Sequence, residues 1–310
     1  MAPGRWTIRP ARSEDVEALR VLDQRAFSEL QRQLTGKPVS LPLRESAYFE
    51  HWLRTDPEGA LVAEEEGQLV GLNFNHARGR SAWIGPLAVH PRWQGRGLGR
   101  ALLEAGLAYL ERRGCGLIGL DTFANNPVSV GLYLKHGFAI VGGLLLLSAP
   151  LAQFPRSEPP PGWQLSPVTP ADLPSIAALE ERYSGFQRLP DFQFHLAWEE
   201  ACAFKLTAQG EIKGYFFGLT KRGEASCGPL YLSADVSPPA GLPPLLGAVA
   251  DFFAARGRIN GNVHASGRNL WLAGYLLAHG FQITRTMVRM VRTGEPPGEP
   301  LGTPFASEKG

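Results

Sequence analysis

The chain is poor in cysteine and contains no long apolar run. Its three cysteines, Cys115, Cys202 and Cys227, are widely separated and form neither a CxxC pair nor a Cys/His ligand set. This spacing argues against a disulfide framework and a metal site, and it predicts a reduced, intracellular protein. No apolar run approaches the roughly 18 residues that span a bilayer, and "MAPGRWTIRP" lacks the apolar core of a signal peptide. We therefore expect a cytoplasmic protein without a membrane or metal partner.

An excess of charge of one sign is also missing. The formal net charge of +2 over 310 residues is too small to indicate a nucleic-acid partner or an anionic membrane surface. With 44% hydrophobic and 19% charged residues, the composition is that of a globular protein with an ample core. The length favours two domains.

The two halves of the chain repeat each other. "GPL" at 85–87 returns at 228–230, and "HGF" at 136–138 returns at 279–281, in both cases 143 residues later. The openings "WTIRPARSEDVEALRVL" and "WQLSPVTPADLPSIAAL" are also alike, each reading as a short strand, a turn and a helix. We interpret the chain as two copies of one α/β unit.

Proline-rich segments mark the expected boundaries. "SAPLAQFPRSEPPPGWQ", at 148–164, is predicted to be an extended linker, because prolines cannot donate ladder hydrogen bonds. The last stretch, "TGEPPGEPLGTPFASEKG", has few apolar residues and is expected to be disordered. The expected organisation is a catalytic domain at 1–150, a linker at 151–162, a second domain at 163–293 and a tail at 294–310.

Each copy is expected to be of the α/β (α+β) class, with a mixed twisted sheet flanked by helices. In the first copy the patterns predict strands at about 5–10 and 82–89, a hairpin turning near Gly67, and a strand over "CGLIGLDTF". Helices are predicted at 13–30, 44–54, 98–113 and over "PVSVGLYLKHG", and "FAIVGGLLLLSA" is predicted to be a closing hairpin. Parallel pairing is expected around the crossover helix at 98–113.

"HPRWQGRGLGRALL", residues 90–103, places three glycines directly before a helix. A strand, a glycine loop and a helix form the arrangement in which backbone N–H groups surround an anion. The loop lacks the GK[ST] ending of a P-loop, and the dinucleotide pattern GxGxxG fails at Arg100. What remains is Q-x-x-G-x-G, formed by Gln94, Gly97 and Gly99.

This loop resembles the acetyl-CoA pyrophosphate loop of the GNAT superfamily of N-acetyltransferases. That family carries N-x-x-A-x-x-L-Y-x-x-x-G-F after the next strand, and "NPVSVGLYLKHGF" at 126–138 matches it with Ser129 in place of alanine. Residues 5–147 follow the family's whole order of elements. The resemblance implies acetyl-CoA as co-substrate, and the chain is similar to a tandem GNAT protein.

The resemblance also implies where the co-substrate binds. The amides of residues 95–100 would hold the pyrophosphate, and Arg96 and Arg100 would add charge-assisted contacts. The strand at 82–89 would splay from the strand at 116–123, so that amides near Leu87 and Val89 bind pantetheine and polarise the thioester carbonyl. The full set of expected binding residues is Leu87, Val89, Gln94, Gly95, Arg96, Gly97, Gly99, Arg100, Asn126, Ser129 and Tyr133.

Two residues are the candidates for proton transfer. Tyr133 matches the family's general-acid tyrosine, and a phenol with a reference pKa of ~10 can donate a proton to a thiolate. Its alternative role is a ring packed on the core. Asp121, in "GLDTF", lies where some family members carry a glutamate base, although a solvated or loop-capping carboxylate is an equal alternative. His76 and His90 are chemical rivals for the base.

The second copy lacks the loop chemistry. At the 143-residue shift "QGRGLG" becomes "SPPAGL", and Tyr133 falls opposite Leu276, with Tyr275 one step away. We therefore predict a degenerate C-terminal copy and an acyl-CoA-dependent N-acyltransferase that transfers acetyl to a primary amine by direct attack. The alternatives are a protein N-terminal or lysine acetyltransferase, and a non-catalytic acyl-CoA-binding or regulatory protein. The sequence is compatible with a monomer or a homodimer.

Overall fold

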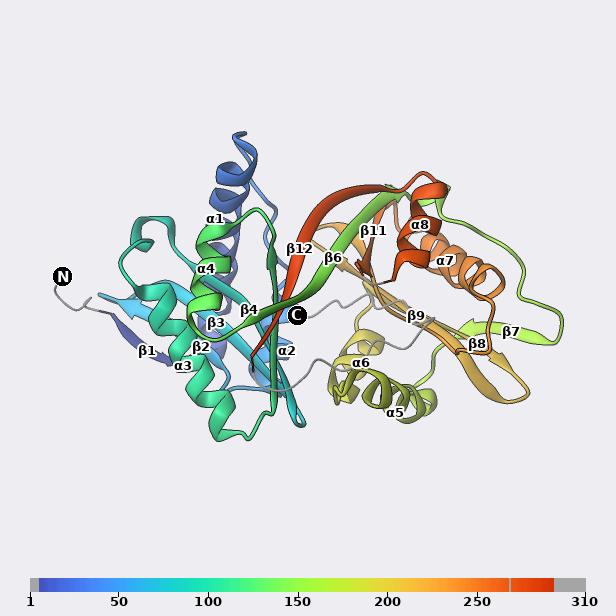
Figure 1. The fold of residues 1–310 in the computed structure, drawn as a ribbon, viewed down its shortest axis with the longest axis horizontal. Helices are drawn as coiled ribbons and strands as arrows, with labels where there is room; N and C mark the ends of the chain where they lie inside the picture. The colour runs from blue at the N-terminus through green and yellow to red at the C-terminus, as the bar shows by residue number, and fades with distance from the viewer. Residues whose placement is uncertain (1–5, 268, 293–310) are drawn as a thin grey trace. The chain divides into compact units, whose positions relative to one another are not determined.

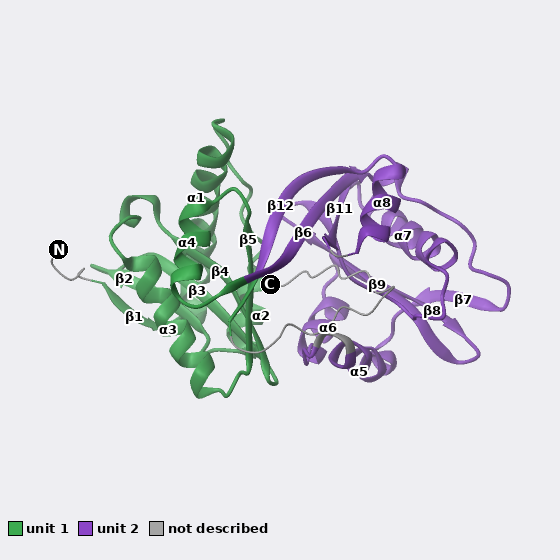
Figure 2. Cartoon of the chain, in the orientation of Figure 1, with its two compact units in different colours: residues 1–139, 290–296, 309–310 green, residues 140–289, 297–308 purple. Residues whose placement is uncertain are grey.

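The chain folds into two compact units (Figure 2). The computed structural model describes residues 6–267 and 269–292. Among these, the first unit comprises residues 6–139 and 290–292, and the second comprises the rest. The expected tail at 294–310 lies outside the described residues.

The first unit is a mixed sheet with helices (Figure 1). Its strands run in the order β1-β2-β3-β4-β5, followed by the last residues of β12; β1 to β4 pair antiparallel, and β4 and β5 pair in parallel. This confirms the mixed sheet and the parallel crossover through the helix at 98–112. The elements are β1 (Thr7–Pro10), α1 (Val16–Thr35), α2 (Ser46–Thr55), β2 (Ala60–Glu65), β3 (Gln68–Arg78), β4 (Ser81–Val89), α3 (Leu98–Arg112), β5 (Leu117–Phe123) and α4 (Pro127–Lys135).

The second unit is built in the same way. Its strands run β12-β6-β11-β10-β9-β8-β7, and β10 and β11 are the parallel pair. The elements are β6 (Ala139–Pro150), β7 (Trp163–Pro167), α5 (Leu173–Ser184), α6 (Leu189–Ala197), β8 (Ala201–Ala208), β9 (Glu211–Lys221), β10 (Glu224–Leu232), α7 (Pro238–Ala254), β11 (Asn260–Ser266), α8 (Leu270–Ala278) and β12 (Gln282–Arg292).

The 143-residue repeat holds to the residue for four pairs of elements. The bounds of β3, β4, β5 and α4, shifted by 143, are those of β9, β10, β11 and α8. The helix N-caps repeat too. Asn126 Oδ1 accepts a hydrogen bond from the Ser129 amide at 3.2 Å, and Asn269 Oδ1 accepts one from the Leu272 amide at 2.9 Å. Both helices therefore begin with the same N-cap.

A buried ion pair ties the first two helices together in each unit. In the first, Arg44 meets Asp23 at 3.2 Å, and in the second Arg188 meets Glu180 at 3.3 Å. The partners are 21 residues apart in the first unit and 8 in the second, so the first holds 13 additional residues between them. This insertion accounts for 13 of the 14 residues by which the shift between the opening tryptophans, Trp6 and Trp163 (157 residues), exceeds the shift of the later motifs (143 residues).

Side chains alternate across the central strand β3, so its two faces can be assigned. Asn73 and Asn75 face α3, since Asn73 Nδ2 donates to the Leu102 carbonyl at 2.9 Å and an added Cβ at Gly106 would lie 2.3 Å from Asn75 Oδ1. Phe74 faces α2, with its ring centroid 5.1 Å from that of Trp52. Helices α2 and α3 therefore cover opposite faces of the first sheet.

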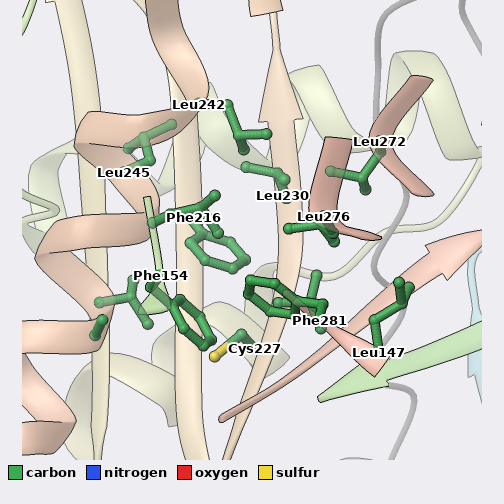
Figure 3. Close-up of a cluster of buried hydrophobic side chains, with 14 of the residues drawn as sticks. Leu147, Phe154, Phe216, Cys227, Leu230, Leu242, Leu245, Leu272, Leu276 and Phe281 are labelled. Carbon is green, nitrogen blue, oxygen red and sulfur yellow. The ribbon is translucent and has the colours of Figure 1, made fainter. Parts of the chain in front are cut away.

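The core of the second unit includes part of the expected linker. Leu151 and Phe154 are 2% exposed and pack with leucines of α7 and α8, and the Phe154 ring lies 4.8 Å from that of Phe281 (Figure 3). The prolines are compatible with this conformation, and the apolar side chains of Leu151 and Phe154 hold the segment in the core. The start of the segment is thus packed rather than extended in solvent.

The closing hairpin predicted over "FAIVGGLLLLSA" is wrong. Residues Ala139–Pro150 form one strand, β6, whose register with β11 runs without interruption from Leu144↔Ser266 to Pro150↔Asn260. Gly143 suggested a turn, but its carbonyl accepts the Gly267 amide at 2.7 Å instead. Pairing with a strand more than a hundred residues away thus keeps this segment in one continuous strand.

Candidate acyl-CoA site

Strand β4 separates from β5 halfway along its length, as the sequence predicts. Their parallel pairing runs from Ser81↔Leu117 to Trp83↔Gly119 and ends there. A bulge follows, because β4 has two residues, Gly85 and Pro86, where β3 has one. The bulge bends β4 away, and its second half pairs with β3 on one side only.

The open edge of β4 presents backbone donors. The His90 amide donates to the Val70 carbonyl of β3 at 2.9 Å. Because successive residues of a strand direct their amides to opposite sides, the N–H groups of Leu87 and Val89 point to the side of β5. Beyond Trp83 that side has no strand partner. The two amides can therefore donate to a ligand, as expected.

Gln94 holds the glycine loop to this edge. Its side-chain Nε2 donates to the Val89 carbonyl at 3.1 Å, and its backbone N–H donates to the Pro91 carbonyl at 3.4 Å. The carbonyl of Val89, on the open side of the strand, is thereby satisfied. Gln94 thus positions the loop against β4.

The loop itself forms a cradle of six amides at residues 95–100. Ala101 is the first residue of α3 whose amide finds a partner, the Gly97 carbonyl at 3.0 Å. Within the described residues, the preceding six amides donate to no protein group. Gly95 and Gly97 have φ of +75° and +87°, and a Cβ on either would meet nothing within 4 Å. This left-handed geometry favours glycine and leaves space for a ligand beside the amides.

The cradle fits the diphosphate of CoA. Consecutive unpaired amides at a helix N-terminus bind anions through directed hydrogen bonds and the positive end of the helix dipole. Arg96 and Arg100 are exposed next to it, and Arg100 makes only a 3.5 Å solvent-exposed ion pair with Glu104. Both guanidinium groups therefore remain accessible to a phosphate.

Tyr133 lies on α4, which packs on β5. Its ring is buried and meets Phe138 edge-on at 5.8 Å. Burial raises the pKa of Tyr133 to about 12. Its hydroxyl makes no hydrogen bond within the described part of the chain, yet it is not among the fully enclosed polar atoms. The phenol is thus protonated at neutral pH and accessible, as a general acid requires.

Asp121 and the two histidines occupy different environments. Asp121 is half-buried on β5, two residues beyond the last residue paired with β4. His76 is buried, with Nε2 2.7 Å from the Gly85 carbonyl. His90 Nδ1 accepts the Arg92 amide at 3.2 Å. Both imidazoles thus have local structural roles, and Asp121 remains our predicted base.

Asn126 and Ser129 act together at the start of α4. Besides the capping bond, Asn126 Nδ2 donates to Ser129 Oγ at 2.8 Å. Sequence reasoning assigned both residues to the co-substrate, and the structure adds that Asn126 stabilises the helix carrying Tyr133.

We expect Asn126→Ala to lower the free energy of unfolding by about 1 kcal/mol, because the Ser129 amide loses its cap. Asn269→Ala is the matched control, since it removes the same cap in the second unit. Chemical denaturation should show similar losses for the two variants, whereas calorimetry should show weaker acetyl-CoA binding only for Asn126→Ala. Equal acetyl-CoA affinities in both variants would limit Asn126 to capping.

The second unit has no equivalent cradle. Helix α7 begins at Pro238, three residues before the position equivalent to Leu98. Pro238 and Pro239 carry no amide hydrogen, and the amides of Ala240 and Gly241 both donate to the Ser237 carbonyl. The amide hydrogens that are available at 95–100 are thus absent or engaged at the equivalent positions here. Leu276, opposite Tyr133 in the repeat, is fully buried.

Comparison with known proteins agrees with this geometry. Residues 23–138 match the acetyltransferase (GNAT) family. A mycothiol acetyltransferase of Cellulomonas flavigena is 35% identical over 173 residues, which cover 52% of this chain and 47% of the relative. The chain thus spans about half the length of the curated relatives it matches.

Two solved structures share the fold over nearly the whole chain. A GCN5-related N-acetyltransferase from Sphaerobacter thermophilus superposes with a TM-score of 0.68 at 19% identity, covering 97% of this chain and 99% of that one. A tandem GNAT protein from the clavulanic acid biosynthesis pathway gives 0.66 at 17% identity, covering 94% and 100%. The architecture is therefore that of two tandem GNAT-like domains, of which the first contains the stretch that matches the acetyltransferase (GNAT) family.

The described residues contain no group of three or more His, Cys, Asp or Glu side chains placed to hold a metal ion. Among the helices that they form, none combines the length and apolar character needed to cross a bilayer.

Proposed function

We propose that this protein is an acyl-CoA-dependent N-acetyltransferase that acetylates a primary amine, with its reaction centre in the first unit. The observation that carries the proposal is the cradle of six unpaired amides at 95–100 beside the open edge of β4. The match of residues 23–138 to the GNAT family supports the reaction class. The name of the relatives, mycothiol acetyltransferase, supports a small-molecule acceptor rather than a protein.

Each group of the site has a proposed task. Acetyl-CoA, when bound, supplies an activated acetyl thioester and a thiol leaving group. The cradle, Arg96 and Arg100 bind its diphosphate, and the amides of Leu87 and Val89 bind pantetheine and polarise the thioester carbonyl, where negative charge develops. Asp121 accepts the proton that the amine loses, directly or through water. Tyr133 donates its proton to the departing sulfur.

Turnover tests the proposal directly. The full chain is incubated with acetyl-CoA and a panel of primary amines, and free thiol is measured. We expect thiol release to depend on the amine. A protein that binds acetyl-CoA but releases no thiol with any amine would instead be a non-catalytic acyl-CoA-binding protein.

We also expect one acetyl-CoA per chain. The amides available at 95–100 have no counterpart at the equivalent positions 238–243, so titration calorimetry on the full chain should give a stoichiometry of one. Two equivalent sites would contradict the assignment of the second unit as a degenerate copy.

A further inference from the structure

A polar cleft of about 580 Å³ lies in the first unit, between α1 and the turn that follows β4. Its lining includes Arg25, Ser28, Ser40, His90 and Arg92. Helix α1, which supplies much of this lining, packs against α2. The cleft therefore lies on the α2 face of the sheet, opposite α3.

The 13-residue insertion forms one wall of this cleft. Helix α1 continues to Thr35, and the segment 36–45 returns along it. Two hydrogen bonds fix the return, since Gln24 Nε2 donates to the Leu41 carbonyl at 2.8 Å and the Leu41 amide donates to Ser28 Oγ at 3.0 Å. In the second unit α5 and α6 are joined by only four residues, 185–188. The wall thus belongs only to the copy that carries the cradle.

The cleft is positively charged. Of its three arginines, Arg32 is paired with Glu29 at 2.6 Å, and Glu29 is the single acidic residue in the lining. Arg25 and Arg92 form no ion pair within the described part of the chain. Burial, together with the charges of Arg25 and Arg92, holds the pKa of His90 below its usual value. At neutral pH the lining therefore offers two unpaired cations and a neutral imidazole.

The cleft adjoins the open strand edge. His90, in its lining, directly follows Val89, whose amide points to the side of β5. A molecule in the cleft would thus lie one residue along the strand from the donors assigned to the thioester carbonyl. This position is suitable for the second substrate.

We propose that the cleft binds a negatively charged group of the acceptor, so that the substrate is an amine that also carries a carboxylate or a phosphate. This inference rests on the proposed function and adds the substrate class. Arg25 and Arg92 bind the anionic group, and Ser28 and Ser40 supply neutral hydrogen bonds.

The proposal is tested with pairs of amines in which one member carries an anionic group and the other does not. The probes are glycine beside glycinamide, 4-aminobutyrate beside its amide, and phosphoethanolamine beside ethanolamine. We expect kcat/KM to favour at least one anionic member by about tenfold or more, since charge-assisted hydrogen bonds are the strong ones. In the double variant Arg25→Gln/Arg92→Gln the ratio should fall to near one. Lys37→Gln, which removes an exposed charge outside the lining, should preserve it.

The possible failures are distinguishable. If neutral and anionic amines react equally, or if the double variant keeps the preference, the anionic-acceptor proposal is wrong and the acetyltransferase assignment stands. If the double variant loses affinity for CoA but not for dephospho-CoA, the arginines bind the ribose phosphate, which also overturns the anionic-acceptor proposal.

If no amine releases thiol, the proposal is decided by calorimetry of the same probes against the CoA-bound full chain. Charge-selective binding that the double variant loses supports the proposal, and its absence overturns it.

Discussion

The Gly97→Glu variant is expected to fold and to lose acetyl-CoA binding. Gly97 has φ of +87° and an added Cβ would meet no atom within 4 Å, so a side chain there projects into the space beside the amides. A carboxylate in that position would occupy the diphosphate site and repel its charge. We expect the dissociation constant to rise by about a hundredfold or more, equivalent to roughly 3 kcal/mol. Titration calorimetry measures it.

Gly210→Glu provides the matched control. Gly210 is in a hairpin turn of the second unit, has φ of +81° and also has open space around a Cβ. The two variants therefore carry the same added charge and a similar backbone cost. Gly210→Glu should bind acetyl-CoA like the parent. A folded Gly97→Glu variant with parental affinity would show that the cradle has been misassigned.

Tyr133→Phe is expected to lower turnover by about 10²–10⁴-fold with little change in acetyl-CoA affinity, the usual range for general acid catalysis. Only the hydroxyl is lost, and it makes no hydrogen bond within the described residues, so the packing against Phe138 is retained. The loss should shrink with acyl donors whose thiols are more acidic, because these leave without protonation. Steady-state kinetics with a competent amine gives both results.

Tyr275→Phe, on the equivalent helix α8, is the control and should leave turnover unchanged. Since burial raises the pKa of Tyr133 to about 12, the acid form persists through neutral and mildly alkaline pH. Ionisation of Tyr133 should therefore not depress the rate until the pH approaches that value. Turnover of Tyr133→Phe within about twofold of the parent, with chemistry rate-limiting, would leave its ring a packing role only.

The site was more predictable from the sequence than the closure of the sheets. The glycines directly before α3 and the asparagine directly before α4 are local signals, because each depends on residues only a few positions away. That residues 139–150 form one uninterrupted strand depends on the pairing of β6 with β11, more than a hundred residues later, which local patterns do not encode.

The cleft and the buried ion pairs were missed for a related reason. Asp23 and Arg44 belong to no motif, and no local pattern in the sequence pairs two charges that are 21 residues apart. A signal for the insertion was nevertheless present. The opening of the repeat is shifted by 157 residues and its later motifs by 143, so the first copy must contain additional residues between them. Comparing those shifts would have located the segment that forms the cleft.

The last strand of the chain, β12, is divided between the two units: residues 282–289 belong to the second and residues 290–292 to the first. The first unit is therefore not one continuous stretch of the chain. A truncation anywhere between residues 140 and 289 would remove the strand that follows β5 in its sheet. Loss of the second copy would thus take a strand from the sheet of the first, and this dependence gives a reason for the two copies to remain in one chain.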